Sequence, residues 1–161
     1  MDQVKILPTC AIALSLLLSA NAFSADNGLI TKSSNYSAKE TTERFERAVK
    51  EKGQSGWIVF GEIDHASAAA NVDLKLRPRT VVVFGNPKLG TMPMQKAPSL
   101  AIDVPLKALV WEDDQGKVWL TYNSAEYLST YVYPRHGLSM PPDAVKGIER
   151  FLADVSEQGT R

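Results

Sequence analysis

The sequence predicts an α+β fold: a two-layer sandwich in which a four-stranded, mostly antiparallel sheet carries helices on one side. Three observations lead to this class. Four short segments are rich in β-branched and aromatic residues, stretches with helical periodicity lie between and after them, and no repeat or linker divides the series. With 44% hydrophobic residues, a chain of 161 residues can bury one core of ordinary size. A four-stranded, three-layer α/β sheet is the alternative.

The single domain is expected over residues 37–157, and it opens with a capped helix. Ser37-Ala-Lys-Glu40 has the form of a capping box, in which the serine hydroxyl and the glutamate each satisfy a free backbone N–H. Phe45 and Val49 lie four residues apart and share one apolar face of this helix. Trp57-Ile-Val-Phe60, which is β-branched and aromatic, predicts the first strand.

The centre of the chain predicts a buried strand that leads through a tight loop into a short helix. Val81-Val-Val-Phe84 is apolar at consecutive positions, as expected for a strand in the middle of a sheet. The loop Gly85-Asn-Pro-Lys-Leu-Gly90 follows it. Thr91 is expected to cap a helix that ends by Pro98, because the residue before a proline resists the helical conformation.

The second half of the chain predicts a hairpin and two helices. Residues 106–122 form two strands around an acidic turn, which brings Trp111 and Trp119 to facing positions. Asn123 is expected to cap a helix. Residues 143–156 carry apolar side chains at helical spacing and predict an amphipathic helix with one docked face.

The two ends of the chain are expected to lie outside the domain. Residues 1–25 are predicted to be a signal peptide: the apolar run at 10–20 is shorter than the roughly 20 residues of a membrane span, and Ala20-Asn-Ala22 has the form that a signal peptidase reads. We therefore expect a periplasmic or secreted protein that is free of the membrane after cleavage. Residues 26–36 are expected to form a flexible arm, and residues 158–161 a frayed tail.

Charge and cysteine content argue against several classes of partner and site. The 18 basic and 18 acidic residues leave no net field that attracts nucleic acid. The only cysteine, Cys10, lies in the predicted signal, so the mature chain has none for disulfides, thiol catalysis or thiolate metal sites. The two histidines, His65 and His136, lack a metal-binding spacing. We predict no metal and no cofactor.

The loop at residues 85–90 is the first candidate binding site. It joins the end of a buried strand to the start of a helix, where free backbone N–H groups and the helix dipole favour an anion. Lys88 would add a positive charge, and Asn86, Gly90 and Thr91 would add polar contacts. The loop lacks the glycine spacing of a phosphate loop. A tight turn explains all of these residues except Lys88.

Asp64 and His65 form the second candidate, at the start of another short helix. A histidine acts as acid, base or ligand near neutral pH, and a neighbouring carboxylate orients it. The alternative is that Asp64 caps the helix and His65 merely packs. We expect this pair to converge with the loop from Asn86 to Thr91 on one pocket for a small anionic ligand. Asp103 is a further candidate carboxylate.

Several segments, taken in order, resemble a known bacterial family, domain of unknown function 302. They are Ile63-Asp-His-Ala66, Leu76-Arg-Pro-Arg-Thr80, Val83-Phe-Gly-Asn-Pro-Lys88, Gly90-Thr-Met-Pro-Met94, Asp103-Val-Pro-Leu-Lys107, Leu109-Val-Trp-Glu-Asp113 and Tyr122-Asn123. The resemblance implies a compact α+β domain, often dimeric, that occurs both alone and exported. It implies no established activity.

Three functions are consistent with these residues, and the first is favoured. It is an exported ligand-binding or interaction domain, a homodimer, with its pocket between the loop from Asn86 to Thr91 and His65. The second is a small hydrolase or isomerase that uses His65 as base, Asp64 or Asp103 to orient it, and Lys88 to hold an anionic substrate. The third is a structural, partner-binding dimer module without a pocket.

Overall fold

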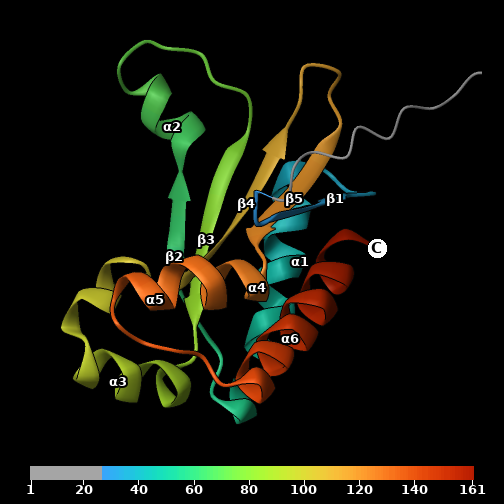
Figure 1. Cartoon of the computed structure of the whole chain (residues 1–161). Coiled ribbons are helices and arrows are strands. Elements are labelled where there is room, and N and C mark those ends of the chain that lie inside the picture. Colours follow the sequence, from blue (N-terminus) through green and yellow to red (C-terminus); the bar gives the residue numbers. More distant parts are fainter. Residues whose placement is uncertain (1–26) are drawn as a thin grey trace, which may run out of the picture.

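A five-stranded antiparallel sheet is the central feature of the computed structural model, which describes residues 27–161 (Figure 1). Its strand order is β1-β5-β4-β3-β2, and every neighbouring pair is antiparallel. The strands are β1 Leu29–Ser33, β2 Ile58–Asp64, β3 Arg79–Gly85, β4 Leu106–Glu112 and β5 Val118–Asn123. The α+β class is confirmed, whereas the expected number of four strands is wrong by one. The predicted signal peptide lies outside the described residues.

The additional strand comes from the segment expected to be a flexible arm. Strand β1 pairs along its whole length with β5, with Ile30 opposite Tyr122 and Thr31 opposite Thr121. The two threonine hydroxyls are 2.9 Å apart and hydrogen-bonded. An edge strand has a neighbour on one side only, so it needs fewer apolar residues than a central strand. That is why its polar sequence gave no strand signal.

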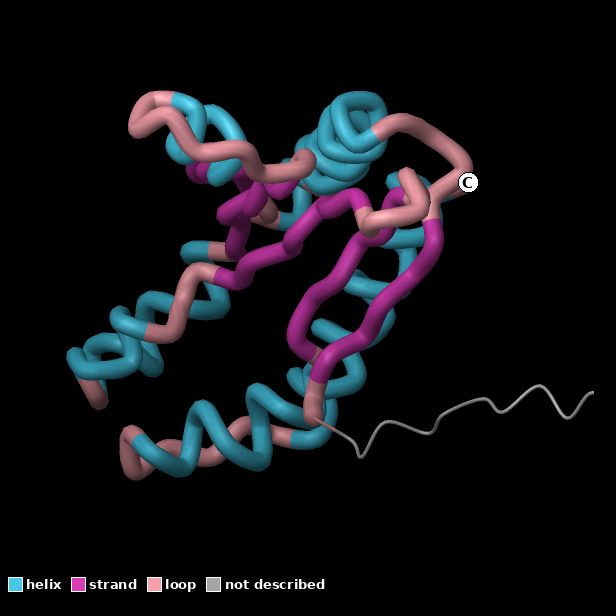
Figure 2. Tube along the Cα trace, turned by 90° about the horizontal axis from the view of Figure 1, so that it is seen from above, coloured by secondary structure: helices cyan, strands magenta, loops and turns pink. Residues whose placement is uncertain are grey.

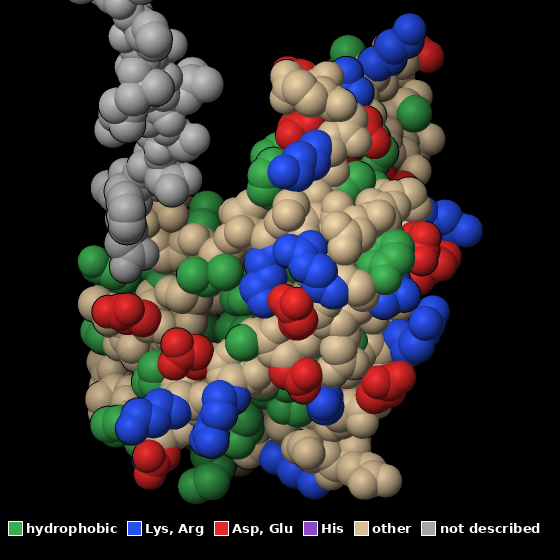
Figure 3. Space-filling model, turned by 90° about the vertical axis from the view of Figure 1, so that its right-hand side faces the viewer, with side chains coloured by type: hydrophobic (Ala, Val, Ile, Leu, Met, Phe, Trp, Pro, Cys, Tyr) green, Lys and Arg blue, Asp and Glu red, His purple; other side chains and the backbone are tan. Residues whose placement is uncertain are grey.

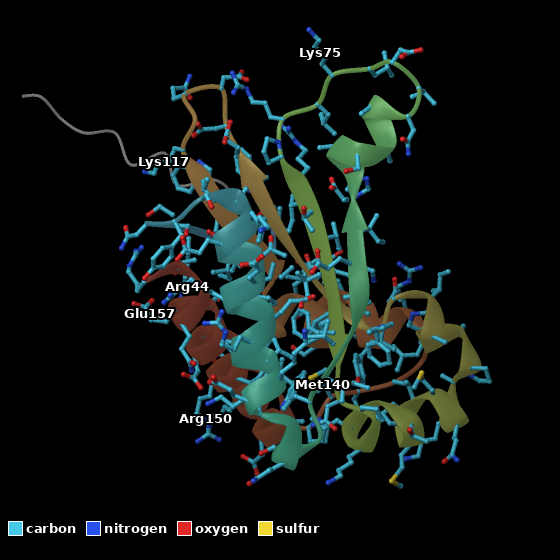
Figure 4. The ribbon with its side chains drawn as sticks, turned by 180° about the vertical axis from the view of Figure 1, so that it is seen from behind. Arg44, Lys75, Lys117, Met140, Arg150 and Glu157 are labelled. Carbon is cyan, nitrogen blue, oxygen red and sulfur yellow. The ribbon has the colours of Figure 1, made fainter. Side chains whose placement is uncertain are left out.

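Helices α1 (Ala38–Glu51) and α6 (Pro142–Thr160) pack against one face of the sheet, as Figure 4 shows from behind. Phe45 of α1 meets the ring of Phe84 of β3 edge to face, with ring centroids 5.3 Å apart. On α6, Phe151 and Val155 are buried in the same core. This face therefore forms the sheet-and-helix layer that the amphipathic patterns predict.

The ends of these two helices show one prediction confirmed and one wrong. Ser37 caps α1 as predicted, because its side chain accepts a hydrogen bond from the backbone N–H of Glu40. The expected frayed tail is instead the last turn of α6. Thr160 is fully buried, and Arg161 Nη1 donates to the backbone oxygen of Ser33 at 2.8 Å.

Most of the remaining helices gather at the end of the sheet where β3 finishes (Figure 1). They are α3 Pro87–Lys96, η2 Pro98–Ile102, α4 Ala125–Tyr127, the π-helical turn η3 Leu128–Val132 and α5 Tyr133–Arg135. Leu100, Leu128 and Val132 form a second small core between them. In the view from above, helices lie on both sides of the strands (Figure 2). This second cluster positions the candidate site.

The opposite end of the sheet carries a projecting loop. Helix α2 (His65–Ala70) follows β2 directly, and the chain then returns to β3 through residues 71–78 (Figure 1). Val72 and Leu74 of this loop are each 64% exposed. Figure 4 places Lys75 of the same loop at the far end of the molecule from Met140. A short turn, η1 (Gly53–Ser55), links α1 to β2 at the end of the molecule where Met140 lies.

Candidate functional site

The clearest concave site among the described residues is an apolar cavity of about 280 Å³ between α3, the end of the sheet and α6. Its lining residues are Trp57, Phe60, Gly85, Asn86, Pro87, Leu89, Gly90, Thr91, Met94, Val104, Pro105, Leu106, Leu128, Tyr133, Met140 and Ile148. None of these side chains carries a charge at neutral pH. Small-ligand pockets are mostly apolar, with a few polar groups that fix orientation, and this cavity has that composition.

A second hollow of about 530 Å³ adjoins the first. The two share Trp57, Asn86, Leu89, Tyr133, Met140 and Ile148 in their walls. Lys96 and Asp143 are among the residues that line the second hollow, so its wall, unlike that of the first, contains charged side chains. The two hollows together form one cleft that is uncharged on one side and partly charged on the other.

Tyr133 contributes a neutral hydroxyl to the cavity wall. The side chain lies between the cavity and the second small core. A phenol is protonated at neutral pH, and burial raises the pKa of Tyr133 further above its usual value of 10.0. The hydroxyl is therefore an uncharged hydrogen-bonding group.

The segment expected to be an open loop is already helical, and Asn86 is its cap. Asn86 Oδ1 accepts a hydrogen bond from the backbone N–H of Lys88 at 3.0 Å, and its Nδ2 donates to the backbone oxygen of Ser55 at 3.0 Å. Pro87 occupies the first turn, where its missing N–H costs nothing. Helix α3 thus begins four residues before the predicted cap, Thr91. The Thr91 hydroxyl instead donates to the backbone oxygen of Pro87 at 2.7 Å.

The two glycines of this segment have different roles in the cavity. A Cβ atom on Gly85 would lie 3.2 Å from the Phe60 ring and 3.3 Å from Pro105 Cβ, so this position needs glycine for close packing. On Gly90 the nearest contact of a Cβ would be the Met94 methyl group, at an ordinary 3.5 Å. Gly90 therefore leaves cavity volume open that a larger side chain would fill.

Lys88 does not line the cavity, although Asn86, Gly90 and Thr91 do. Its side chain is exposed and passes beside Gly56. The expected electrostatic contribution of Lys88 is therefore absent from the cavity wall. Of the four residues of this segment predicted as ligand contacts, three line the cavity and Lys88 does not.

Asp64 and His65 lie at the other end of the sheet, so the expected shared pocket does not form. Asp64 pairs with Thr80 at the start of β3, whereas Gly85, next to Asn86, pairs with Ile58. Five residues of strand separate Thr80 from Gly85, a distance of roughly 16 Å. The error arose because β2 and β3 are antiparallel: their loops leave from opposite ends of the sheet.

The chemistry of Asp64 is that of a helix cap. Its carboxylate accepts hydrogen bonds from the backbone N–H groups of Ala66 and Ser67 and from the Ser67 hydroxyl. The Ser67 bonds are the main reason that the pKa of Asp64 is below its usual value. His65 is exposed, and no side-chain hydrogen bond joins it to Asp64 or to another described residue. The proposed base and its orienting partner are therefore not assembled.

Asp103 is engaged instead by His136, a residue that the sequence analysis did not select as a site. His136 Nε2 lies 2.6 Å from Asp103 Oδ2, and His136 Nδ1 lies 2.8 Å from the hydroxyl oxygen of Ser99. Arg135 Nε is 3.4 Å from the same Asp103 oxygen. No spacing motif joins these residues, because they come from η2 and α5 and meet only in the folded chain.

Two kinds of feature are absent from residues 27–161. No group of three or more metal-ligating His, Asp, Glu or Cys side chains comes together there. Within the same range, no helix has both the length and the apolar character that a membrane crossing requires. Acidic and basic side chains are interspersed on the face of the molecule seen in Figure 3.

Comparisons with known proteins place residues 30–156 in the family described as "Domain of unknown function DUF302". The chain is 40% identical over 124 residues to proteins named "Fluoride-specific ion channel FluC 1" in Brucella suis and Brucella abortus, which covers 76% of this chain. It spans 46% and 43% of those two proteins, less than half of their length.

A solved structure, described as an uncharacterized conserved protein DUF302 from Bacillus stearothermophilus, has the same fold. It matches with a TM-score of 0.64 and 17% sequence identity, over 82% of this chain and 98% of that one. At 17% identity, the similarity shows that the two chains share a fold.

Proposed function

The chain belongs to the family described as domain of unknown function DUF302, and from the uncharged cavity beneath α3 we propose that it binds a small, predominantly apolar ligand. One observation carries this proposal: a cavity of about 280 Å³ whose lining contains no charged side chain. An uncharged lining favours a ligand that gains from leaving water, since transfer of apolar surface contributes about 25 cal/mol per Å².

The polar groups at the cavity limit what the ligand carries. Asn86 and Thr91 already use their side chains on backbone partners, so each has little capacity left for a ligand. The Tyr133 hydroxyl and the Trp57 indole N–H are the remaining polar side-chain groups of the wall, and both are neutral. This composition supports a neutral ligand with few hydrogen-bonding groups, and it gives no support to the anionic ligand expected from Lys88.

The proposal is tested with the neutral fluorescent probe N-phenyl-1-naphthylamine, whose emission rises in apolar surroundings. Gly90→Leu is designed to fill the cavity, and Gly90→Ala is its matched control, because a Cβ there meets only the Met94 methyl group at 3.5 Å. We expect Gly90→Leu to weaken probe binding about tenfold or more, whereas Gly90→Ala stays within about threefold of the wild type. Equal affinity in all three proteins would contradict the cavity as the site.

A second probe separates a neutral ligand from an anionic one. Lys88→Ala is expected to leave binding of the neutral probe unchanged, since Lys88 is outside the cavity wall. The sulfonate probe 1-anilinonaphthalene-8-sulfonate tests the electrostatic alternative under the same conditions. If Lys88→Ala weakens the sulfonate alone by tenfold or more, the anionic site expected from the sequence regains support.

The channel name of the Brucella relatives describes, we infer, the part of those proteins that has no counterpart here. The matched segment is 46% of the Brucella suis protein, and residues 27–161 contain no helix suited to cross a membrane. The shared domain then acts as an attached module in those proteins. Its relation to ion transport is tested by deleting it from the Brucella protein and measuring fluoride efflux from vesicles.

The location of the protein remains a prediction from residues 1–25. An exported domain is expected to reach the periplasm or medium and to lose its signal. Mass spectrometry of the N-terminus after expression in a bacterium measures this directly. Retention of Met1 in the mature protein would contradict export by cleavage.

We also propose a homodimer that uses the sheet face opposite α1 and α6. Ile63, Val81 and Leu109 lie in line across β2, β3 and β4 on that face, and Ile63 is 48% exposed. In a two-fold dimer the same patch of each protomer packs against its copy. An apolar patch can do so without charge repulsion, and the chain has zero net charge. The bulge residue Phe60, at 54% exposed, extends the apolar surface toward the cavity.

Light scattering after size-exclusion chromatography tests the dimer. Ile63→Glu is expected to shift the protein to a monomer, because it would bury a charge on the symmetry axis or beside it. Ile30→Glu, on the edge strand and 41% exposed, is the matched control and should leave the mass unchanged. A wild-type protein that is monomeric at about 100 µM would contradict the proposal.

A further inference from the structure

Ser99, His136 and Asp103 form a hydrogen-bonded chain on the surface beside the cavity. Ser99 lies in η2, Asp103 ends that helix, and His136 ends α5. The hydroxyl oxygen of Ser99 is 2.8 Å from His136 Nδ1, and His136 Nε2 is 2.6 Å from Asp103 Oδ2. We propose that this chain is a serine-nucleophile site that hydrolyses carboxylic esters with small apolar acyl groups.

The carboxylate fixes the state of the histidine ring. An ionised Asp103 only accepts hydrogen bonds, so His136 Nε2 must carry the proton of the 2.6 Å bond. In the neutral imidazole, Nδ1 then has a free lone pair, and the Ser99 hydroxyl donates to it. This is the arrangement that prepares a hydroxyl for attack: nucleophile, base and orienting carboxylate in sequence.

The three side chains differ in burial: the base and the carboxylate are shielded from water, whereas the nucleophile is accessible to a substrate. The His136 side chain is 5% exposed and that of Asp103 is 22% exposed, so water does not compete strongly for their bond. Ser99 is exposed and open to an incoming substrate. Arg135, with Nε 3.4 Å from Asp103 Oδ2, places a positive charge beside the same carboxylate oxygen.

The residue next to the nucleophile indicates the acyl group. Side chains three residues apart on a 3₁₀ helix are aligned, so Ile102 lies on the same side of η2 as Ser99. Ile102 is 75% exposed, the largest exposed fraction among the large apolar side chains of the described residues. It offers an apolar contact for a short acyl chain. It offers no charge to an anionic substrate.

The reaction proceeds in two balanced steps. In the first, Ser99 Oγ bonds to the ester carbonyl carbon and passes its proton to His136 Nδ1. The bond to the leaving oxygen then breaks, and the alcohol departs with that proton. In the second, water gives a proton to His136 Nδ1 and attacks the acyl-serine. The carboxylic acid leaves and Ser99 regains its proton. Water is the only co-reactant.

In this scheme Ser99 and His136 touch the reacting atoms, and Asp103 is a positioning residue. The site is independent of the apolar cavity, since none of the three residues lines it. The alternative is that these three hydrogen-bonded residues have a structural role and link η2 to α5.

The first test measures hydrolysis of p-nitrophenyl acetate and labelling by a fluorophosphonate probe, with the labelled peptide identified by mass spectrometry. We expect label on Ser99, and a loss of about 100-fold or more in kcat/KM for Ser99→Ala. Ser139→Ala is the matched control, because Ser139 is also an exposed serine in this part of the molecule. Label on another residue, or full activity in Ser99→Ala, would overturn the proposal.

The second test separates catalysis from a structural link. His136→Ala is expected to lose hydrolysis and to recover part of it with added imidazole, whereas His65→Ala controls for unspecific hydrolysis by an exposed histidine. Asp103→Asn is expected to lose activity at an unchanged melting temperature, since an amide that donates to Nε2 forces the wrong tautomer. A purely structural link predicts the reverse: a lower melting temperature in Asp103→Asn and no hydrolysis in the wild type.

Discussion

Trp57 and Phe151 stack face to face, with ring centroids 3.4 Å apart and planes 4° from parallel. Trp57 lines the cavity, and Phe151 belongs to the core between the sheet and α6. The stack therefore makes one wall of the cavity a part of the core. Because packed interiors have few voids, a change at Phe151 is felt at the cavity wall.

Phe151→Ala is expected to lower the free energy of unfolding by about 3–5 kcal/mol, the usual cost of removing a large buried aromatic side chain. It should also weaken binding of N-phenyl-1-naphthylamine, because Trp57 loses its support. Urea denaturation measures the first effect. Phe151→Leu keeps most of the volume and is expected to lose clearly less stability. Equal losses in the two variants would contradict this expectation, because they would assign the loss to the aromatic stack rather than to the filled volume.

Gly159 and Gly147 offer a matched pair on α6. A Cβ on Gly159 would lie 3.1 Å from Phe45 Cβ and 3.3 Å from Phe45 Cα, whereas one on Gly147 has nothing within 4 Å. Gly147→Ala is therefore expected to stabilise the protein by up to about 1 kcal/mol through helix propensity. Gly159→Ala is expected to destabilise it, because the buried Phe45 backbone cannot move away freely.

Urea denaturation of the two alanine variants measures this difference. The informative quantity is the sign, which should be opposite for the two positions. Stabilisation by both substitutions would mean that α6 slides relative to α1 at small cost.

The edge strand β1 predicts a contrast between two substitutions at Lys32. Ser34 N donates to Val118 O, and pairs in an antiparallel ladder alternate, so Lys32 N also donates into β5, opposite Leu120. Lys32→Pro removes that donor and is expected to detach β1. Lys32→Ala keeps the backbone bond and loses a 3.3 Å hydrogen bond from Nζ to the backbone oxygen of Ala153 and a partly exposed ion pair with Glu157. A partly exposed ion pair contributes less than about 1 kcal/mol.

Hydrogen exchange of the β5 amides distinguishes these outcomes. Exchange should accelerate in Lys32→Pro and stay close to the wild type in Lys32→Ala. The same rates in all three proteins would mean that residues 29–33 form a flexible arm after all.

Glu62 predicts a pH dependence of stability. Burial, together with a hydrogen bond to Glu46, raises the pKa of Glu62 above its usual value of 4.5. The folded protein thus holds this proton more tightly than the unfolded chain. The contribution of the group to stability is complete below pH 4.5 and is lost as the pH rises through the folded pKa. Glu62→Gln removes this loss.

Chemical denaturation at a series of pH values measures the effect. The stability of Glu62→Gln relative to the wild type is expected to rise from about pH 4.5 upward and then to level off. Glu149→Gln, on the exposed face of α6, is the control and should follow the wild type. A constant difference at every pH would contradict the raised pKa.

The parts of the fold that local chemistry specifies were predictable. Ser37 caps α1 because a serine hydroxyl satisfies a free N–H wherever the chain turns into a helix. Trp111 and Trp119 face each other, with ring centroids 6.1 Å apart, because the hairpin sets its own register. Each of these features depends on residues that are close in the sequence.

The errors concern contacts between distant residues. Residues 29–33 are a strand only because β5 offers them a free edge, and the last turn of α6 is ordered only because α1 receives it. His65 and Asn86 were expected to be neighbours, but the antiparallel pairing of β2 with β3 sends them to opposite ends of the sheet. Sequence periodicity contains no information on strand direction, so this error was unavoidable.

The sequence by itself determined the family, the α+β class, the start of α1 and the hairpin around Trp111 and Trp119, because short-range hydrogen bonding and side-chain periodicity decide them. Only the tertiary structure decided which polar residues meet. Asp103, which the hydrolase alternative offered beside Asp64 as a partner of His65, lies beside His136, and Lys88 lies outside the cavity wall. The physical reason is that a site consists of contacts between distant residues, and these depend on strand order and direction rather than on local propensity.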